Sequence, residues 1–495
     1  MSKLDTSTSL PASWNFVPLK ELGDWSGGGT PSKAKPQYWQ GGTIPWVSPK
    51  DMKTEQISDS EDHITKDAVS HSATSLINAG SVLIVTRSGI LRHTLPVAVN
   101  SVPVTVNQDL KALTPRNGIM AEYVAWALRA FSRDILHICS KQGTTVNSVE
   151  TSKLLGFEIP VAPRVQQAKI VAEIKKQFSR LDEAVANLKR VKANLKRYKA
   201  SALKAAVEGK LTEDWRKQHP DVEPASKLLE RILAERRTKW NGRGKYKEPV
   251  KPDTNNLPSL PEKWTWASLD QLTSHITSGS RDWTRYYGRG SGTFILAQNV
   301  RLMRLDLRER QAVDPPKNDA ETARTRVSIG DILVTIVGAK TGEVCRIPKE
   351  LVDHFVCQSV ALLRPLMPAS AKFMELYLAS PENGQAQWRQ YIYGQGRPHL
   401  SFEQLKMTAI ALPSLAESQE IVAEVERRLS IIDNLEAAVQ ANLARADRLR
   451  QSILSQAFSG QLLGGDTKRA PDILPTFSIA AESQSAYGKD GHAGR

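Results

Sequence analysis

The stretch LPASWNFVPLKEL, residues 10–22, returns as LPEKWTWASLDQL at residues 260–272. Leucine, proline, tryptophan and two further leucines keep the same spacing in both stretches. The agreement continues at a nearly constant offset through these segments: Gly80–Ile84 and Gly330–Val334, Gln108 and Gln358, Pro115 and Pro365, Ile170–Ile174 and Ile421–Val425, and Gly209–Leu211 and Gly460–Leu462. Because this repeat is too long for a solenoid unit, it predicts a domain duplicated together with the segment that joins it to its copy.

The composition is that of a globular protein. The chain has 495 residues and a hydrophobic fraction of 40%, which allows two or more hydrophobic cores. Its N-terminus has no charged region followed by an apolar one, and no stretch is apolar for long enough to cross a bilayer. Cys139, Cys345 and Cys357 lack metal-site spacing, so we expect neither a disulfide framework nor a zinc site. These features predict a cytoplasmic protein.

The net charge points to a polyanionic partner. The chain carries a formal charge of +15 at pH 7, and each Lys or Arg that faces a phosphate gains binding free energy by releasing a counterion. Nucleic acid is therefore the leading candidate. The alternative is that the basic charge serves only solubility.

Two segments have the spacing of long helices. From Pro163 to Gly209, and again from Pro413 to Gly460, apolar residues recur on one face and no Gly or Pro interrupts them. Each helix would run about 40 residues, or about 60 Å, which is far longer than a globular domain needs. We expect the two apolar stripes to pack on each other as an intramolecular coiled coil. Homodimerisation through the same stripe is the alternative.

The direction of the two helices is open from the sequence alone. The connector at residues 212–258 contains several prolines and a short helical run at 225–240, and it is long enough for either topology. A pseudo-two-fold axis would make the helices antiparallel and place one globular domain at each end. We prefer this arrangement to a parallel pair, because two inverted readers suit a duplex whose strands are themselves inverted.

The remaining segments predict two α+β domains. Short β-rich runs such as Ser81–Thr86 and Ile332–Val337 alternate with turns and with the helical runs Ala121–Ala130 and Ala371–Ala379. Beyond Gly464 the chain is polar and small, which predicts a disordered tail. The expected division is a first domain at 1–162, a long helix at 163–211, a linker with a short helix at 212–258, a second domain at 259–413, a second long helix at 414–462 and the tail at 463–495.

No motif for catalysis stands out. Asp314–Lys317 reads Asp-Pro-Pro-Lys and resembles the tetrad of amino-methyltransferases, but a lysine cannot stack on a flipped base as the aromatic of that tetrad does. A turn is the better interpretation. The chain has no Gly-x-x-x-x-Gly-Lys-Ser/Thr loop for ATP, and its histidines and carboxylates show no metal or catalytic spacing. The sequence therefore predicts a binding module.

The repeated phrases resemble those of a known family, the specificity (S) subunits of Type I restriction-modification systems, over essentially the whole chain to about Leu463. In that family each half opens with Pro-x-x-Trp-x-x-x-x-Leu. A long helix then begins near Pro-Leu-Ala-Glu-Gln-x-x-Ile-Val, similar to residues 413–422 and 163–171 here, although each copy keeps only half of the Glu-Gln pair. The helices end in phrases similar to Phe-Ser-Gly-Lys-Leu, at residues 207–212 and 458–462.

This resemblance implies a division of labour. Each half would hold a target recognition domain that reads one part of a split DNA site, and the helix pair would set the spacer between the parts. The subunit would be noncatalytic and hold no cofactor itself. It would assemble on double-stranded DNA with two modification subunits, which bind S-adenosylmethionine and methylate adenine N6, and with restriction subunits that use ATP and Mg²⁺ for cleavage.

Divergence between the copies indicates the DNA-reading loops, because a shared scaffold must match whereas two readers of different bases must differ. The divergent loops are residues 30–39, 86–94 and 141–147 in the first copy, and 280–289, 339–341 and 394–399 in the second. Arg can span guanine O6 and N7, Gln can hold adenine, and aromatic rings can stack on bases. The candidate DNA-binding residues are Lys33, Lys35, Tyr38, Trp39, Arg87, Arg92, His93, Gln142, Thr144, Arg281, Trp283, Arg285, Tyr286, Gln298, Lys340, Arg397 and His399.

Two other functions are compatible with parts of this pattern. The chain could be a structural scaffold whose helix pair binds other proteins while the basic loops bind nucleic acid without specificity. It could also be a fused methyltransferase or nuclease, although the missing motifs disfavour this. For each candidate residue, an ordinary surface side chain is the alternative.

Overall fold

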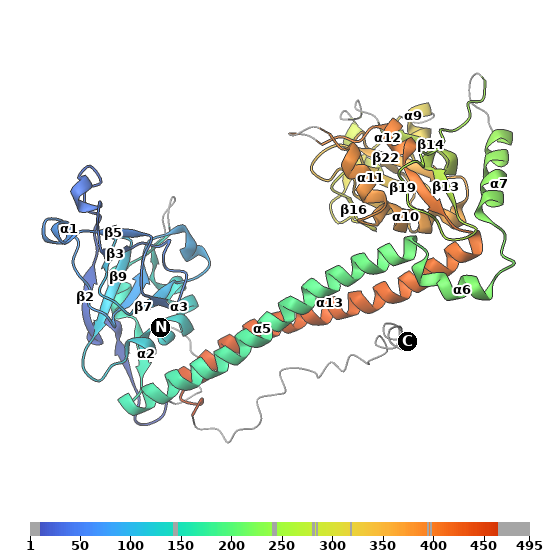
Figure 1. Ribbon diagram of the computed structural model, residues 1–495. Coiled ribbons are helices and arrows are strands. Elements are labelled where there is room, and N and C mark those ends of the chain that lie inside the picture. The colour runs from blue at the N-terminus through green and yellow to red at the C-terminus, as the bar shows by residue number, and fades with distance from the viewer. Residues whose placement is uncertain are drawn as a thin grey trace, which may run out of the picture. The chain divides into compact units, whose positions relative to one another are not determined.

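The chain divides into two compact units. This computed structural model describes residues 10–141, 147–239, 245–279, 283, 286–316, 319–393, 396 and 398–463. The first unit comprises Met1–Asn187 with Asn442–Arg495, and the second comprises Leu188–Ala441. Residues 464–495, for which the sequence predicts disorder, lie outside the described part. Each unit mixes helices and sheets, as the sequence predicts (Figure 1).

The first unit is built around a five-stranded sheet. Its central strand β6 has a continuous apolar run and is buried along its whole length, because the sheet is covered on both faces. A three-stranded sheet, a two-stranded sheet and a small hairpin described below complete the unit. In spatial order the sheets are β2 (Gly23–Gly27), β9 (Leu110–Pro115), β6 (Val82–Val85), β7 (Val97–Asn100) and β4 (Gln56–Ile57); then β5 (Asp62–Ile64), β3 (Ile44–Val47) and β8 (Thr105–Val106); and β1 (Asn15–Pro18) with β12 (Glu158–Val161).

The second unit has sheets of matching order. In the first unit, β3 pairs with β8 in parallel and with β5 antiparallel. The middle strand of the second unit's three-stranded sheet also has one parallel and one antiparallel partner. The sheets are β14 (Thr273–Ser278), β22 (Val360–Pro365), β19 (Ile332–Thr335) and β20 (Val344–Arg346); then β18 (Gln311–Val313), β15 (Tyr287–Ile295) and β21 (His354–Val356); β13 (Thr265–Ser268) with β23 (Ala409–Leu412); and the hairpin β16 (Val300–Arg301) with β17 (Arg304–Leu305).

Short helices accompany these sheets. In the first unit they are α1 (Lys66–Ser70), α2 (Ala121–Ala130), α3 (Ser132–Cys139) and α4 (Thr151–Gly156), with the small hairpin β10 (Ser140–Lys141) and β11 (Ser148–Val149) after α3. In the second unit they are α6 (Glu213–Gln218), α7 (Ala225–Thr238), α8 (Leu269–Leu272), α9 (Ala320–Thr325), α10 (Ala371–Ala379), α11 (Gly384–Tyr391) and α12 (Phe402–Met407). The helices α2 and α10 have the bounds predicted from the sequence.

Two long helices, α5 (Arg164–Val207) and α13 (Leu415–Phe458), each contribute to both units. The first unit contains the start of α5 and the end of α13, so Ile174 and Phe178 share a core with Ile453 and Phe458. The second unit contains the end of α5 and the start of α13. The apolar residues of each long helix therefore pack against the sheets and short helices of a unit as well as against the other long helix.

Within the second unit the two helices run in opposite directions. Lys192 Nζ donates to Gln440 Oε1 at 3.3 Å, and Lys199 Nζ lies 3.5 Å from Asp433 Oδ1. From Lys192 to Lys199 the residue number rises along α5, whereas the number of the partner on α13 falls by the same amount, from Gln440 to Asp433. In the first unit, Arg450 of α13 pairs with Asp182 of α5.

The repeated Pro-x-x-Trp phrase fastens each domain to helix ends. Trp14 Nε1 donates to Gln166 Oε1 at 2.7 Å, where α5 begins, and Trp264 Nε1 donates to Glu417 Oε2 at 2.8 Å, where α13 begins. Both indoles are buried. The phrase recurs in the sequence because the same junction is built twice.

The same phrase also meets the glycine that follows the other long helix. Gly460 and Gly209 have φ values of +81° and +72°, which favour glycine. A Cβ on Gly460 would lie 2.3 Å from Pro11 Cγ, and one on Gly209 would lie 2.9 Å from Pro261 Cγ. These glycines are required by both the helix stop and the close approach of the proline.

Candidate nucleic-acid interface

Two of the divergent loops meet in the first unit. The loop that follows β6 lies against the β10–β11 hairpin, because Ser88 N–H donates to the Asn147 carbonyl at 3.1 Å. Arg92 Nε donates to Asn147 Oδ1 at 3.3 Å, and Arg87 forms an isolated antiparallel bridge with Ser148. Loops separated by about 50 residues in the sequence therefore form one surface.

The corresponding loops meet in the second unit. Gly338 N–H and Thr341 Oγ1 each donate to the Pro398 carbonyl at 3.0 Å. Val337 bridges to His399, which is the counterpart of the bridge between Arg87 and Ser148. The loops of the two units differ in almost every residue, yet the same backbone arrangement holds them in place. A surface whose side chains vary on a fixed scaffold requires such an arrangement.

A turn that carries a matching glutamine joins the third divergent loop to this surface. In the first unit, Thr86 and Arg87 donate their N–H groups to the Asp109 carbonyl at 2.8 and 3.2 Å. On the other side, Thr30 Oγ1 donates to Oε1 of the exposed Gln108 at 2.6 Å. The turn therefore lies between two of the variable loops.

The second unit repeats this turn around Gln358. The Cys357 carbonyl accepts from Gly279 N–H at 3.1 Å, and the Ser359 carbonyl accepts from Ile336 N–H at 2.9 Å. Both glutamines match between the copies, so we expected them to belong to the scaffold. The positions of Gln108 and Gln358 show that a residue conserved between the two copies can still lie at the loop surface. In the sequence, the signal for this was that each glutamine lies in a polar turn between divergent segments.

Comparison with known proteins shows which family the first part of the chain resembles. Residues 11–197 match the family model described as the Type I restriction modification DNA specificity domain. The specificity subunit of the Escherichia coli enzyme EcoR124I/EcoR124II is 44% identical over 167 residues, which are 34% of this chain and 41% of that protein. The specificity subunit of EcoKI, from E. coli strain K12, is 26% identical over 344 residues, 68% of this chain and 65% of that protein.

Residues 11–197 of this chain are therefore similar to the DNA specificity domain of type I restriction-modification systems. The resemblance to the specificity-subunit family is confirmed. The matches span less than two thirds of the length of either relative. A solved structure described as the basis of complex assembly and conformational transition of the type I R-M system has a TM-score of 0.64 and 19% identity, and covers 92% of this chain and 100% of that chain. It has the same fold.

In the specificity domain, the charged candidates are exposed and two of the aromatic candidates are not. Lys33, Lys35, Arg87, Arg92 and His93 are exposed. Tyr38 is only 4% exposed and belongs to a small core with Trp46, Ile64 and Ala68. Trp39 is half-buried, with its ring edge-on to Trp46 at 5.3 Å. The burial of Tyr38 leaves its ring no free face for a base, so the expectation that it stacks on a base does not fit this structure.

The second unit shows the same contrast. Trp283 is 2% exposed and packs on Phe294 and Phe355, at ring distances of 5.5 and 5.8 Å. It is a core residue, so the expectation that it stacks on a base does not fit this structure. Tyr286 and His399 are half-buried, and Gln298 and Lys340 are exposed. Five candidates lie outside the described residues: Gln142, Thr144, Arg281, Arg285 and Arg397.

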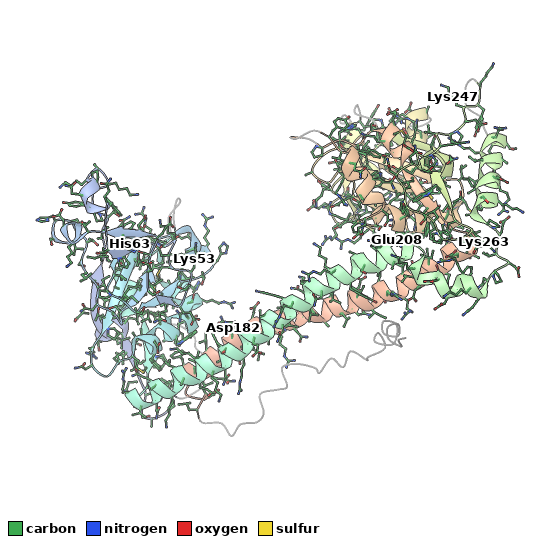
Figure 2. All side chains as sticks on the ribbon, viewed as in Figure 1. Lys53, His63, Asp182, Glu208, Lys247 and Lys263 are labelled. Atoms are coloured by element: carbon green, nitrogen blue, oxygen red, sulfur yellow. The ribbon has the colours of Figure 1, made fainter. Side chains whose placement is uncertain are left out.

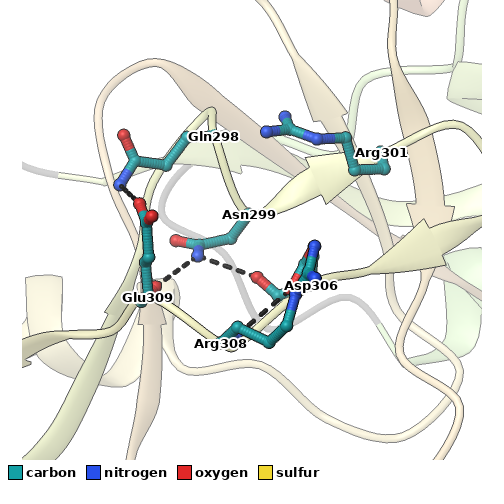
Figure 3. Close-up of a pocket in the computed structure, with 6 residues that line it drawn as sticks. All are labelled: Gln298, Asn299, Arg301, Asp306, Arg308 and Glu309. Carbon is teal, nitrogen blue, oxygen red and sulfur yellow. Dashed lines mark hydrogen bonds and ion pairs between the residues drawn. The ribbon is translucent and has the colours of Figure 1, made fainter. Parts of the chain in front are cut away.

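Gln298 lines a pocket of about 370 Å³ beside the β16–β17 hairpin (Figure 3). Its amide lies 3.5 Å from Glu309 Oε2. Arg308 donates to both carboxylate oxygens of Asp306 and holds the pKa of that carboxyl well below its usual range. Because the lining has two carboxylates, Asp306 and Glu309, for its two arginines, its positive charge is offset locally, which disfavours binding of a free phosphate.

Neither a metal centre nor a membrane segment is found in the described parts of the chain. Among those residues, no group of three or more His, Cys, Asp or Glu side chains could hold a metal ion. None of the described helices is long and apolar enough to span a bilayer. Asp314–Pro316 follow β18 without regular structure, and Lys317, the last residue of the predicted turn, lies outside the described residues.

Proposed function

We propose that this chain is the noncatalytic DNA-specificity subunit of a type I restriction-modification complex, and that each of its two units reads one half of a bipartite DNA site. The observation that carries this proposal is the same loop surface built twice from different residues. In both units a backbone bridge at matched positions brings two of the loop segments together, and a matching glutamine turn is hydrogen-bonded beside them. The family match of residues 11–197 supports DNA recognition by the first unit.

We further propose that α5 and α13 form an antiparallel coiled coil that sets the spacer between the two half-sites, with a pseudo-two-fold axis across the pair. The opposite direction of the helices in the second unit supports this. So does the exchange of helix ends, since each unit contains the start of one helix and the end of the other. The target recognition domains would be residues 1–162 and 259–413.

The chemistry would belong to partner subunits. Two modification subunits would supply S-adenosylmethionine-dependent methylation of adenine N6, and restriction subunits would supply ATP- and Mg²⁺-dependent cleavage, in the cytoplasm where the DNA lies. Both relatives described above are specificity subunits of type I restriction enzymes, which supports this assembly. This chain would provide recognition and spacing.

Exchange of one recognition domain tests the division of labour. Replacing residues 10–162 by the corresponding domain of another specificity subunit is expected to change one half of the methylated motif and to leave the other half and the spacer unchanged. Sequencing of N6-methyladenine across the genome, with the parent gene, without it and with the chimera, measures all three. The proposal fails if no split motif disappears when the gene is deleted, or if both halves change in the chimera.

Removing two exposed arginines of the first unit is expected to weaken DNA binding in a sequence-dependent way. For the variant R87A/R92A, assembled with its modification subunits, we expect affinity for the cognate site to fall by about 1 to 3 kcal/mol if these arginines make one base contact. The slope of log K against log salt should fall by about 0.9 for each phosphate that the variant no longer neutralises. Fluorescence anisotropy over a salt series measures both.

The matched control removes the same charge elsewhere. Lys227 and Lys251 are exposed and lie in the linker, so K227A/K251A should leave the preference for cognate over scrambled DNA unchanged. Equal reductions in the two double variants would show that net charge, rather than the loop surface, governs binding.

A further inference from the structure

A strand surface that is covered in the second unit is open in the first. At matched positions of β13 and β1, Trp266 is half-buried and packs against the core, whereas Phe16 is 46% exposed. The neighbours follow the same trend: Ala267 is buried where Val17 is half-buried, and Ser268 is buried where Pro18 is half-buried. Among the described residues, this face of the first unit therefore has no cover like that of its counterpart.

The cover in the second unit is the linker that follows α5. Ala225 N–H donates to the Lys263 carbonyl at 2.8 Å. Lys263, labelled in Figure 2, donates through Nζ to the carbonyls of Pro220 and Val222. From the linker, α7 buries Ala225, Leu228 and Ile232 in the core of that unit. The linker is thus anchored by a short proline-rich turn and by apolar side chains.

The C-terminal tail repeats the sequence of this anchor. Residues 220–224 read Pro-Asp-Val-Glu-Pro, and residues 471–475 read Pro-Asp-Ile-Leu-Pro. The spacing from Gly209 to the first segment equals the spacing from Gly460 to the second, so both lie at the same distance after a long helix. In the same alignment Ile479 takes the position of Leu228. The duplication therefore continues past the helix ends.

We propose that residues 471–480 of the tail bind the open face of the first unit around Phe16, as the linker binds the second unit. The chain length permits this, because Leu462 already packs against the first unit's core, as Leu211 packs against the second's. The tail has Thr476 for Ala225 and Ser483 for Ile232. It buries fewer apolar side chains than the linker and is held more weakly.

Disulfide trapping in the full-length chain tests this proposal. Ser13 and Thr476 correspond to Lys263 and Ala225, whose backbones are hydrogen-bonded, so S13C/T476C should form a disulfide under mild oxidation. Ser13 is exposed, and the natural cysteines Cys139, Cys345 and Cys357 are buried and do not compete. The control is S13C/H492C, in which the second cysteine is farther along the tail.

The two double variants distinguish a bound tail from a free one. For a free chain the longer tether alone lowers the closure rate by only about threefold, whereas binding at residues 471–480 should favour S13C/T476C by about tenfold or more. Adding I479D should return the ratio to the free-chain value and should raise amide hydrogen exchange at residues 14–19. A ratio near threefold that I479D does not change would overturn the proposal.

Discussion

Replacing Glu417 by alanine is expected to lower the free energy of unfolding of the second unit by about 3 to 5 kcal/mol. The Glu417 side chain is 2% exposed and lies 2.5 Å from Arg216 Nη1. It also accepts hydrogen bonds from Thr212 Oγ1 at 2.7 Å and from Trp264 Nε1 at 2.8 Å. Alanine would leave a mostly buried guanidinium without its carboxylate and the Trp264 N–H without its acceptor, at the point where domain, linker and helix meet.

The first unit supplies the control for this prediction. Gln166 occupies the corresponding position and accepts from Trp14 Nε1, so Q166A removes one neutral hydrogen bond and should cost about 1 kcal/mol. Urea unfolding of both variants, followed by circular dichroism and by hydrogen exchange of each unit, measures the two effects. Equal effects would mean that the charge of Glu417 contributes nothing to the junction.

Replacing Gly460 by alanine is expected to destabilise the first unit by about 2 to 5 kcal/mol. The left-handed backbone alone costs a residue with a Cβ about 1 to 2 kcal/mol. The new Cβ would also lie 2.3 Å from Pro11 Cγ, and forcing an extra carbon into a packed site costs about 1 to 3 kcal/mol more. The helix end and the opening phrase of the domain would have to separate.

Gly80 is the matched control, because it has φ +80° in the same unit and no heavy atom lies within 4 Å of the position that a Cβ would occupy. G80A should therefore cost only the backbone strain, about 1 to 2 kcal/mol. Thermal unfolding followed by hydrogen exchange of the first unit compares them. If G460A is no worse than G80A, the contact with Pro11 does not contribute to stability.

Other matched positions keep their geometry while the chemistry changes. Ser81, just before β6, and Thr114 of β9 share a hydroxyl hydrogen bond of 2.8 Å. The corresponding pair is Asp331, just before β19, with Arg364 of β22, and it makes contacts of 2.6 and 2.8 Å. The Arg364 side chain also affects a neighbouring residue: burial and the nearby Arg364 lower the pKa of His275, which favours the neutral form of that imidazole. Framework positions can therefore diverge as well, so divergence alone does not identify a DNA contact.

The sequence by itself determined the repeat, the long helices and the central strands. Each of these is encoded locally: α5 and α13 by apolar periodicity without Gly or Pro, β6 and β19 by short apolar runs, and the helix ends by glycine. The phrases around Trp14 and Trp264 were recognisable because the same buried junction is built twice.

Only the tertiary structure decided which distant segments meet. Nothing in the local pattern shows that Arg87 bridges to Ser148, or that Val337 bridges to His399. An aromatic residue in a divergent loop can face solvent or fill a core, and packing placed Tyr38 and Trp283 in the core. The exchange of helix ends between the units also follows from packing, because Gly209 and Gly460 fit against the proline of the other copy. Local periodicity fixes the elements, but long-range burial selects their neighbours.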